Sequence, residues 1–152
     1  MINLKIGSLI FHLCFIMVFI FAAFNTVAQK KPATRGELNF SMKDFQHVLA
    51  EAKASHKKIF VDAYAVWCAP CKKLQETTFK DPKAADYFNR HFINISIDVE
   101  KGEGVGLAKA WRIEGLPALL ILDENGNQLL NHTGYVDGKG LLEFAKEAAR
   151  KK

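Results

Sequence analysis

The stretch of sequence that decides the fold is Trp67-Cys68-Ala69-Pro70-Cys71. Two cysteines separated by two residues can close into one small disulfide ring, and the same spacing also occurs as half of a metal site. Spacing alone therefore leaves both a redox pair and a metal site open.

The residues on either side of this stretch predict a change from strand to helix. Upstream, residues 58–65 form an apolar run of strand length that contains one acid, Asp62. Downstream, the sequence of residues 72–76 is typical of a helix. We therefore expect Cys68 to face the free backbone N–H groups and the positive dipole end of a helix, which stabilise a thiolate.

Length and charge limit the classes of protein to consider. The chain has 152 residues, enough for one domain with a hydrophobic core, and a formal net charge of +5. Apart from Arg150-Lys151-Lys152, the basic residues are scattered among acids, without a basic stripe interleaved with aromatic residues. This pattern argues against a nucleic-acid partner and favours an ordinary solvated surface.

The first 28 residues have the pattern of an export signal. Lys5 precedes an almost wholly apolar segment over residues 6–24, and Thr26-Val27-Ala28 offers small residues to a signal peptidase that cuts before Gln29. We predict a signal peptide over residues 1–28. An uncleaved membrane anchor is the alternative, because an apolar run of about 19 residues can span a bilayer.

Cleavage at that point removes Cys14 and leaves only Cys68 and Cys71. A disulfide ring this small constrains little of the unfolded chain, so chemistry explains the pair better than stability does. A zinc site needs two further ligands, and no histidine of the mature chain lies at a close ligand spacing. We therefore predict no metal.

Hydrophobic periodicity predicts one α/β domain over residues 37–152, after a polar linker over residues 29–36. Ser41 is expected to cap a first helix, with Asp44 as the acidic half of a capping box. The dipeptide Asn125-Gly126 predicts a type I′ hairpin turn. The other expected elements are strands over residues 59–65, 92–99, 118–123 and 128–134, and helices over residues 68–78, 81–90, 105–111 and from Asp137 or Gly138 onward. This order predicts a central mixed sheet flanked by helices.

Three separated segments resemble the thioredoxin superfamily. They are residues 60–72 with the CxxC, Gly115-Leu116-Pro117 before a strand, and Asp123-Glu124-Asn125-Gly126 at the hairpin. Residues 77–82 and 133–137 make the C-terminal thioredoxin-like domain of the periplasmic disulfide interchange protein DsbD the nearest resemblance. The resemblance implies a thioredoxin fold. Two departures are Ala69, where thioredoxins have glycine, and Asn94, where cytosolic thioredoxins place a lysine near the buried acid.

The resemblance also implies a role for each residue of the site. Cys68 is expected to be the exposed nucleophile that attacks a substrate disulfide, and the less exposed Cys71 is expected to resolve the mixed disulfide. Burial in an apolar strand should raise the pKa of Asp62. By resemblance, Asp62 takes the proton from Cys71 through water; an acid bound only to backbone is the structural alternative.

A cis Leu116–Pro117 peptide bond beside the cysteines is implied as well. It leaves the Leu116 backbone free to pair with an extended substrate segment, whereas an ordinary trans proline would only start a strand. Trp67 is expected at the rim of the site, with core packing as the alternative. The predicted substrate-binding residues are Trp67, Ala69, Pro70, Leu116 and Pro117.

The sequence thus predicts an exported, monomeric thiol–disulfide oxidoreductase that reduces protein disulfides in the bacterial periplasm. No cofactor beyond the Cys68–Cys71 dithiol is expected, and the partners are protein disulfides and a thiol electron donor. The membrane is a partner only if residues 1–28 stay uncleaved, which would anchor the domain facing the periplasm. Two alternatives remain open: a dedicated reductant in cytochrome c maturation, and a non-catalytic thioredoxin-like binding module or chaperone.

Overall fold

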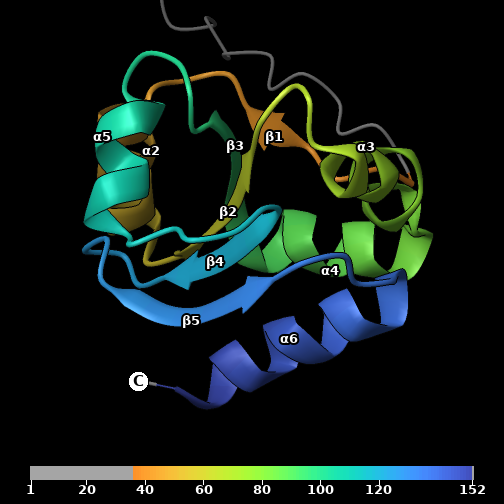
Figure 1. Cartoon of the computed structure of the whole chain (residues 1–152). Coiled ribbons are helices and arrows are strands. Elements are labelled where there is room, and N and C mark those ends of the chain that lie inside the picture. The colour runs from red at the N-terminus through yellow and green to blue at the C-terminus, as the bar shows by residue number, and fades with distance from the viewer. Residues whose placement is uncertain (1–35, 152) are drawn as a thin grey trace, which may run out of the picture. The chain divides into compact units, whose positions relative to one another are not determined.

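A computed structural model describes residues 36–151 (Figure 1). The predicted signal peptide over residues 1–28, and all of the predicted linker except Gly36, lie outside the described residues. In chain order the elements are β1 (Phe40–Ser41), α2 (Phe45–Ser55), β2 (Lys58–Tyr64), α3 (Ala69–Glu76), the 3-10 helix η1 (Thr78–Lys80), α4 (Pro82–His91), β3 (Phe92–Asp98), α5 (Gly104–Ala110), β4 (Ala118–Leu122), β5 (Gln128–Thr133) and α6 (Gly138–Arg150).

The strands form one mixed sheet with the order β1-β3-β2-β4-β5. β3 pairs in parallel with both β1 and β2, whereas the β2–β4 and β4–β5 pairs are antiparallel. The middle strand, β2, is buried over most of its length, as its largely apolar sequence predicts. The predicted thioredoxin fold with a central mixed sheet is confirmed.

Helices cover both faces of the sheet (Figure 1). α2 and α5 lie together on one face, over a core that includes Ile59, Val61 and Ile95. Residues from α3, α4 and α6 pack on the other face, around Phe60 and Phe88, whose rings meet edge to face at 4.6 Å. Alternate residues of β2 therefore point into two separate cores.

The first helix begins later than the sequence suggests. Asp44 is the N-cap of α2 and accepts a hydrogen bond from the His47 N–H, whereas Ser41 belongs to β1, where it pairs with Ile95. The capping box predicted from Ser41 is therefore wrong. Both residues can cap a helix, and pairing with β3 decides between them.

The hairpin between β4 and β5 also differs from the predicted type I′ turn. Gly126 has a positive φ of 88°, but Asn125 does not, and a type I′ turn requires positive φ at both central residues. Instead, the Asp123 Oδ1 accepts hydrogen bonds from the backbone N–H groups of Asn125 and Asn127. The Asp123 side chain therefore organises a longer loop, and the β4–β5 register shifts between Ile121 and Leu122.

Within residues 36–151, none of the helices combines the length and the apolar character needed to cross a bilayer.

Candidate active site

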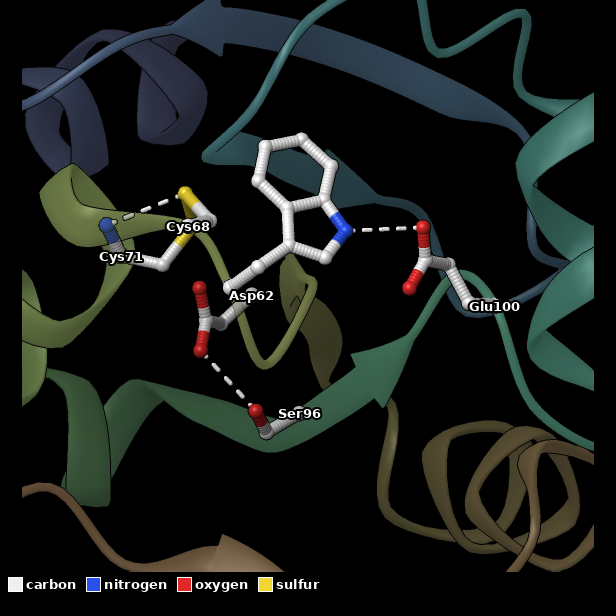
Figure 2. Close-up of a disulfide and its surroundings, with 6 residues drawn as sticks. Asp62, Cys68, Cys71, Ser96 and Glu100 are labelled. Carbon is white, nitrogen blue, oxygen red and sulfur yellow. Dashed lines mark hydrogen bonds between the residues drawn. A yellow bond between two sulfur atoms is a disulfide. The ribbon is translucent and has the colours of Figure 1, made fainter.

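The two cysteines lie where β2 passes into α3. Cys68 is the N-cap residue of α3, and its Sγ accepts a hydrogen bond from the Cys71 N–H at 3.2 Å (Figure 2). Pro70 occupies the first turn of the helix, where a missing N–H breaks no helical bond. Cys68 and Cys71 form a disulfide with an S–S distance of 2.01 Å. The predicted position of Cys68 at a helix N-terminus is therefore found in the structure.

Both sulfur-bearing residues are buried in this disulfide form. Cys68 is 2% exposed and Cys71 is 1% exposed, so the expected difference in exposure between them is absent. The disulfide packs with Ala65, Tyr64, Val99 and Leu116. The chain around it is open to solvent, because Ala69 and Pro70 are exposed on one side and Val66 and Trp67 on the other.

Asp62 lies on the face of β2 that is directed toward α3 and α4. Phe60, two residues earlier, packs in the core on that face, and strand alternation places Asp62 beside it. Asp62 is only 1% exposed, and its Oδ2 accepts a hydrogen bond from the Ser96 hydroxyl at 2.9 Å. Burial raises the pKa of Asp62 to about 7, and the bond from Ser96 partly offsets that rise.

The second carboxyl oxygen of Asp62, Oδ1, has no hydrogen-bond partner among residues 36–151. Figure 2 shows the carboxyl group between the disulfide and Ser96, with one oxygen directed to the Ser96 hydroxyl and the other toward the disulfide. Asp62 and Ser96 also line a pocket of about 260 Å³. The other lining residues are Glu37, Leu38, Phe40, Gln75 and Phe79.

Asn94, which the resemblance places at the position of the lysine of cytosolic thioredoxins, donates its side-chain hydrogen bonds away from Asp62. It pairs in register with Phe60, and its amide donates to the Asn39 carbonyl and to the Asn89 Oδ1, both at 3.1 Å. The side chain that reaches Asp62 is Ser96, which lies directly opposite it in the β2–β3 pairing. The sequence could have indicated Ser96, because it lies two residues after Asn94 and therefore on the same face of β3.

The Leu116–Pro117 peptide bond is cis, as the resemblance implies. Leu116 packs against the disulfide cluster, and it lies outside the β2–β4 pairing, which ends at Ala63 and Ala118. The chain thus brings Leu116 to the cysteines from a segment more than forty residues away in sequence. The roles of Leu116 and Pro117 in substrate binding stay predictions.

Trp67 lies at the rim of the site, with 66% of its surface exposed. Its indole N–H donates to the Glu100 Oε1 at 2.8 Å (Figure 2). Sequence reasoning missed Glu100, which follows β3 and carries no local signal of this contact. The prediction of a rim position for Trp67, rather than a core position, agrees with its exposure.

No group of three or more His, Cys, Asp or Glu side chains within residues 36–151 has an arrangement that could hold a metal ion. The absence of a metal or cofactor in the working protein stays a prediction.

This geometry agrees with comparisons to known proteins. The sequence pattern of the thioredoxin-like domain matches residues 45–149, which include the disulfide, Asp62 and Pro117. The chain belongs to the thioredoxin-like family of disulfide oxidoreductases. It carries a CxxC disulfide between Cys68 and Cys71. The family and the disulfide together indicate a redox enzyme as the general class of protein.

Among thioredoxin-like relatives, the thiol:disulfide interchange protein DsbD of Pseudoalteromonas atlantica is 30% identical over 115 residues, or 74% of this chain and 19% of the relative. The DsbD of Vibrio vulnificus is 32% identical over 107 residues, or 68% of this chain and 18% of the relative. The chain therefore spans about a fifth of the length of these curated relatives.

Solved structures show the same thioredoxin-like fold. The solution structure of a proposed disulphide isomerase from Bacteroides thetaiotaomicron superposes with a TM-score of 0.68 at 38% identity, covering 79% of this chain and 99% of that one. The oxidised C-terminal domain of Neisseria meningitidis DsbD superposes with a TM-score of 0.57 at 22% identity, covering 73% of this chain and 98% of that one. The second likeness supports the fold alone.

Proposed function

We propose that this protein is an exported thiol–disulfide oxidoreductase that reduces disulfides of other proteins. The observation that carries the proposal is the hydrogen bond from the Cys71 N–H to the Cys68 Sγ at the start of α3. In the reduced protein, a Cys68 thiolate accepts the same bond and meets the positive end of the helix dipole. Both interactions favour the ionised sulfur, which is the attacking form.

The reaction proceeds in two exchanges. The Cys68 thiolate attacks one sulfur of the substrate disulfide, the substrate S–S bond breaks, and one substrate sulfur leaves as a thiolate. Cys71 then gives its proton to Asp62 and attacks the Cys68 Sγ, which releases the second substrate thiolate and closes the Cys68–Cys71 disulfide. Two electrons pass from the cysteine pair to the substrate. A dithiol protein donor must then reduce the pair again.

Asp62 suits the proton step because its pKa is about 7. A group with a pKa near the working pH is partly ionised, so it can both accept a proton and release it. Asp62 lies on the sheet face under α3, the helix that carries Cys71.

The surface around the disulfide suits an extended protein segment. Trp67 and Val66 are exposed apolar side chains on one side, and Leu116, with a backbone outside the sheet pairing, lies against the disulfide. A strand of the substrate could pair with the free Leu116 backbone while its neighbouring side chains contact Trp67. This arrangement supports protein disulfides as substrates.

The direction of electron flow is set by the reduction potential of the pair. Proline between the cysteines and the likeness to thiol:disulfide interchange proteins support a reductant. A change of about 30 mV corresponds to about 1.4 kcal/mol, so the methyl group of Ala69 can influence the potential. Equilibration of the purified protein with glutathione mixtures should give a potential closer to that of thioredoxin, about −270 mV, than to that of DsbA, about −120 mV.

Insulin reduction with dithiothreitol tests the proposed function. The wild-type protein should accelerate insulin precipitation, Cys68→Ser should abolish the acceleration, and Cys71→Ser should accumulate mixed disulfides through Cys68. The Cys71→Ser protein is the matched control, because it retains the attacking sulfur. Wild-type protein without any acceleration over buffer would instead indicate a binding module.

The export part of the proposal rests on residues 1–28, with their apolar segment over residues 6–24 and the small residues before Gln29. Mass spectrometry of the protein recovered from a periplasmic extract should give a chain that begins at Gln29. A full-length chain in the membrane fraction would indicate an anchor instead.

A further inference from the structure

The polar residues on the buried face of β2 and β3 divide into two separate groups. Asn94 is bound to Asn39 and Asn89, away from the acid, whereas Ser96 is bound to Asp62. The Asp62 carboxyl therefore has one defined partner among the described side chains, and that partner holds only one of its two oxygens.

We propose that Ser96 is a positioning residue for the proton transfer: by holding the Asp62 Oδ2, it leaves Oδ1 as the oxygen that exchanges protons through the neighbouring pocket. The proposal rests on the proposed function, because the proton in question is the one that Cys71 gives up. A hydroxyl that donates to one carboxyl oxygen also fixes the plane of the group, and so directs the other oxygen.

The pocket that Asp62 and Ser96 line lies next to the buried carboxyl and offers it a route to solvent. Its volume of about 260 Å³ far exceeds the space of about 10–15 Å³ that one water molecule needs. Gln75 lines the pocket and follows Cys71 by four residues, so both side chains lie on one face of α3. Through Gln75 the pocket therefore borders the face of α3 that carries Cys71.

Three elements contribute polar groups around Asp62. Glu37 comes from the segment before β1, and Gln75 comes from α3, which also carries the cysteine pair. The Ser96 hydroxyl comes from β3. The influences on the pKa of Asp62 are burial, which raises it, and the Ser96 hydrogen bond, which lowers it. Removal of the hydroxyl should therefore move the titration of Asp62 to higher pH.

The test is a titration of the Asp62 carboxyl carbon by NMR in the disulfide form, in which the cysteines do not titrate. Ser96→Ala should raise the titration midpoint by about one pH unit, since a hydrogen bond to a charged group is worth about that much. Ser96→Thr retains a hydroxyl and should restore the midpoint. Asn94→Ala is the matched control: it removes a buried polar side chain two residues away on the same face and should leave the midpoint unchanged.

A kinetic measurement distinguishes positioning from a structural role. In the reduced protein at pH 7, Ser96→Ala should slow the resolution of a mixed disulfide by about fivefold, because a midpoint near pH 8 leaves about a fifth as much ionised Asp62. The rate of the first attack by Cys68 should not change, and the two proteins should converge near pH 9.

Two results would overturn the proposal: an Asp62 midpoint that Ser96→Ala leaves in place, or an equal shift caused by Asn94→Ala. Failure of the proposed function gives a different result, because the wild-type protein would then not reduce insulin while the effect of Ser96 on the Asp62 midpoint remained.

Discussion

β2 and β3 present two faces that differ in chemistry although they share one backbone. The face toward α2 and α5 is wholly apolar and buried; its residues are Ile59, Val61, Ala63, Ile93, Ile95 and Ile97. The opposite face mixes aromatic packing with polar groups, through Phe60, Asp62, Phe92, Asn94 and Ser96. Neighbouring residues of the same strand thus serve different purposes.

The polar face carries unsatisfied groups that the apolar face does not. The Oδ1 atoms of Asp62 and Asn94 are buried without hydrogen-bond partners among the described residues. A buried polar atom without a partner costs about 1–3 kcal/mol, and a buried charge costs more. The apolar face therefore supplies stability, while the polar face gives up stability to hold a buried carboxyl near the disulfide.

Replacement of Asp62 should have the largest effect on stability, and the effect should depend on pH. The folded pKa of Asp62 is about 7, above the ordinary value of 3.8 for an aspartate. The stability that protonated Asp62 contributes is therefore fully present below pH 3.8 and is lost as the pH rises through 7. From pH 4 to pH 8, the free energy of unfolding of the Asp62→Asn variant should therefore rise by about 4 kcal/mol relative to that of the wild type. Urea unfolding at both pH values measures this, and an equal stability difference at pH 4 and pH 8 would contradict the buried titration.

The same substitution should impair the chemistry that the carboxyl serves. Asp62→Asn should slow insulin reduction at pH 7 by about tenfold to 100-fold, because it removes the group that accepts the proton of Cys71. A pH–rate profile from pH 6 to pH 9 checks this, and a profile identical to that of the wild type would remove Asp62 from the mechanism.

On the apolar face, Ile95→Ala should lower the free energy of unfolding by about 3 kcal/mol, because it removes buried apolar surface and leaves a cavity. Ile95 is 1% exposed and packs in the core under α2 and α5. Unlike the effect of Asp62, this loss should be the same at pH 4 and pH 8. Guanidinium unfolding measures it, and a strong pH dependence would mean that the two faces are coupled.

Asn94→Ala should lower the free energy of unfolding by a smaller amount, about 1–2 kcal/mol. It removes hydrogen bonds to Asn39 and Asn89, but it also removes an oxygen that has no partner among the described residues. Insulin reduction should stay within about twofold of the wild type, since Asn94 does not contact Asp62. Unfolding curves and the insulin assay test the two parts separately. A large loss of activity would show that the polar groups on this face act together.

The smallest effect is expected at the rim, outside both faces. Glu100→Gln keeps a hydrogen-bond acceptor for the exposed Trp67 indole, so the free energy of unfolding should change by less than about 0.5 kcal/mol. Chemical denaturation of the variant beside the wild type measures this. A larger loss would mean that the rim supports the fold.

Local sequence signals were enough to predict most of the fold and of the candidate site. The apolar run of β2, the CxxC at the start of α3 and the proline before β4 each lie within a few residues of what they determine. Asp81 and Pro82 likewise mark the start of α4, where Asp81 accepts hydrogen bonds from two backbone N–H groups. Each of these elements could be predicted because its signal is contained in the element itself.

The parts that could not be predicted depend on contacts between distant residues. β1 has only two residues and is defined by pairing with β3, more than fifty residues later. The bond between Trp67 and Glu100 spans 33 residues. Such contacts leave no mark on local periodicity, which explains why the sequence predicts Ser41 as a helix cap.

The placement of the two tryptophans gives the protein two separate optical reporters. Trp111 is buried and meets the Phe45 ring edge to face at 5.2 Å, so its emission should follow unfolding of the α2 and α5 layer. Trp67 is exposed and adjoins Cys68 in the chain, so its emission should respond to a docked partner. Replacing either indole with phenylalanine would therefore allow binding and unfolding to be followed independently by fluorescence.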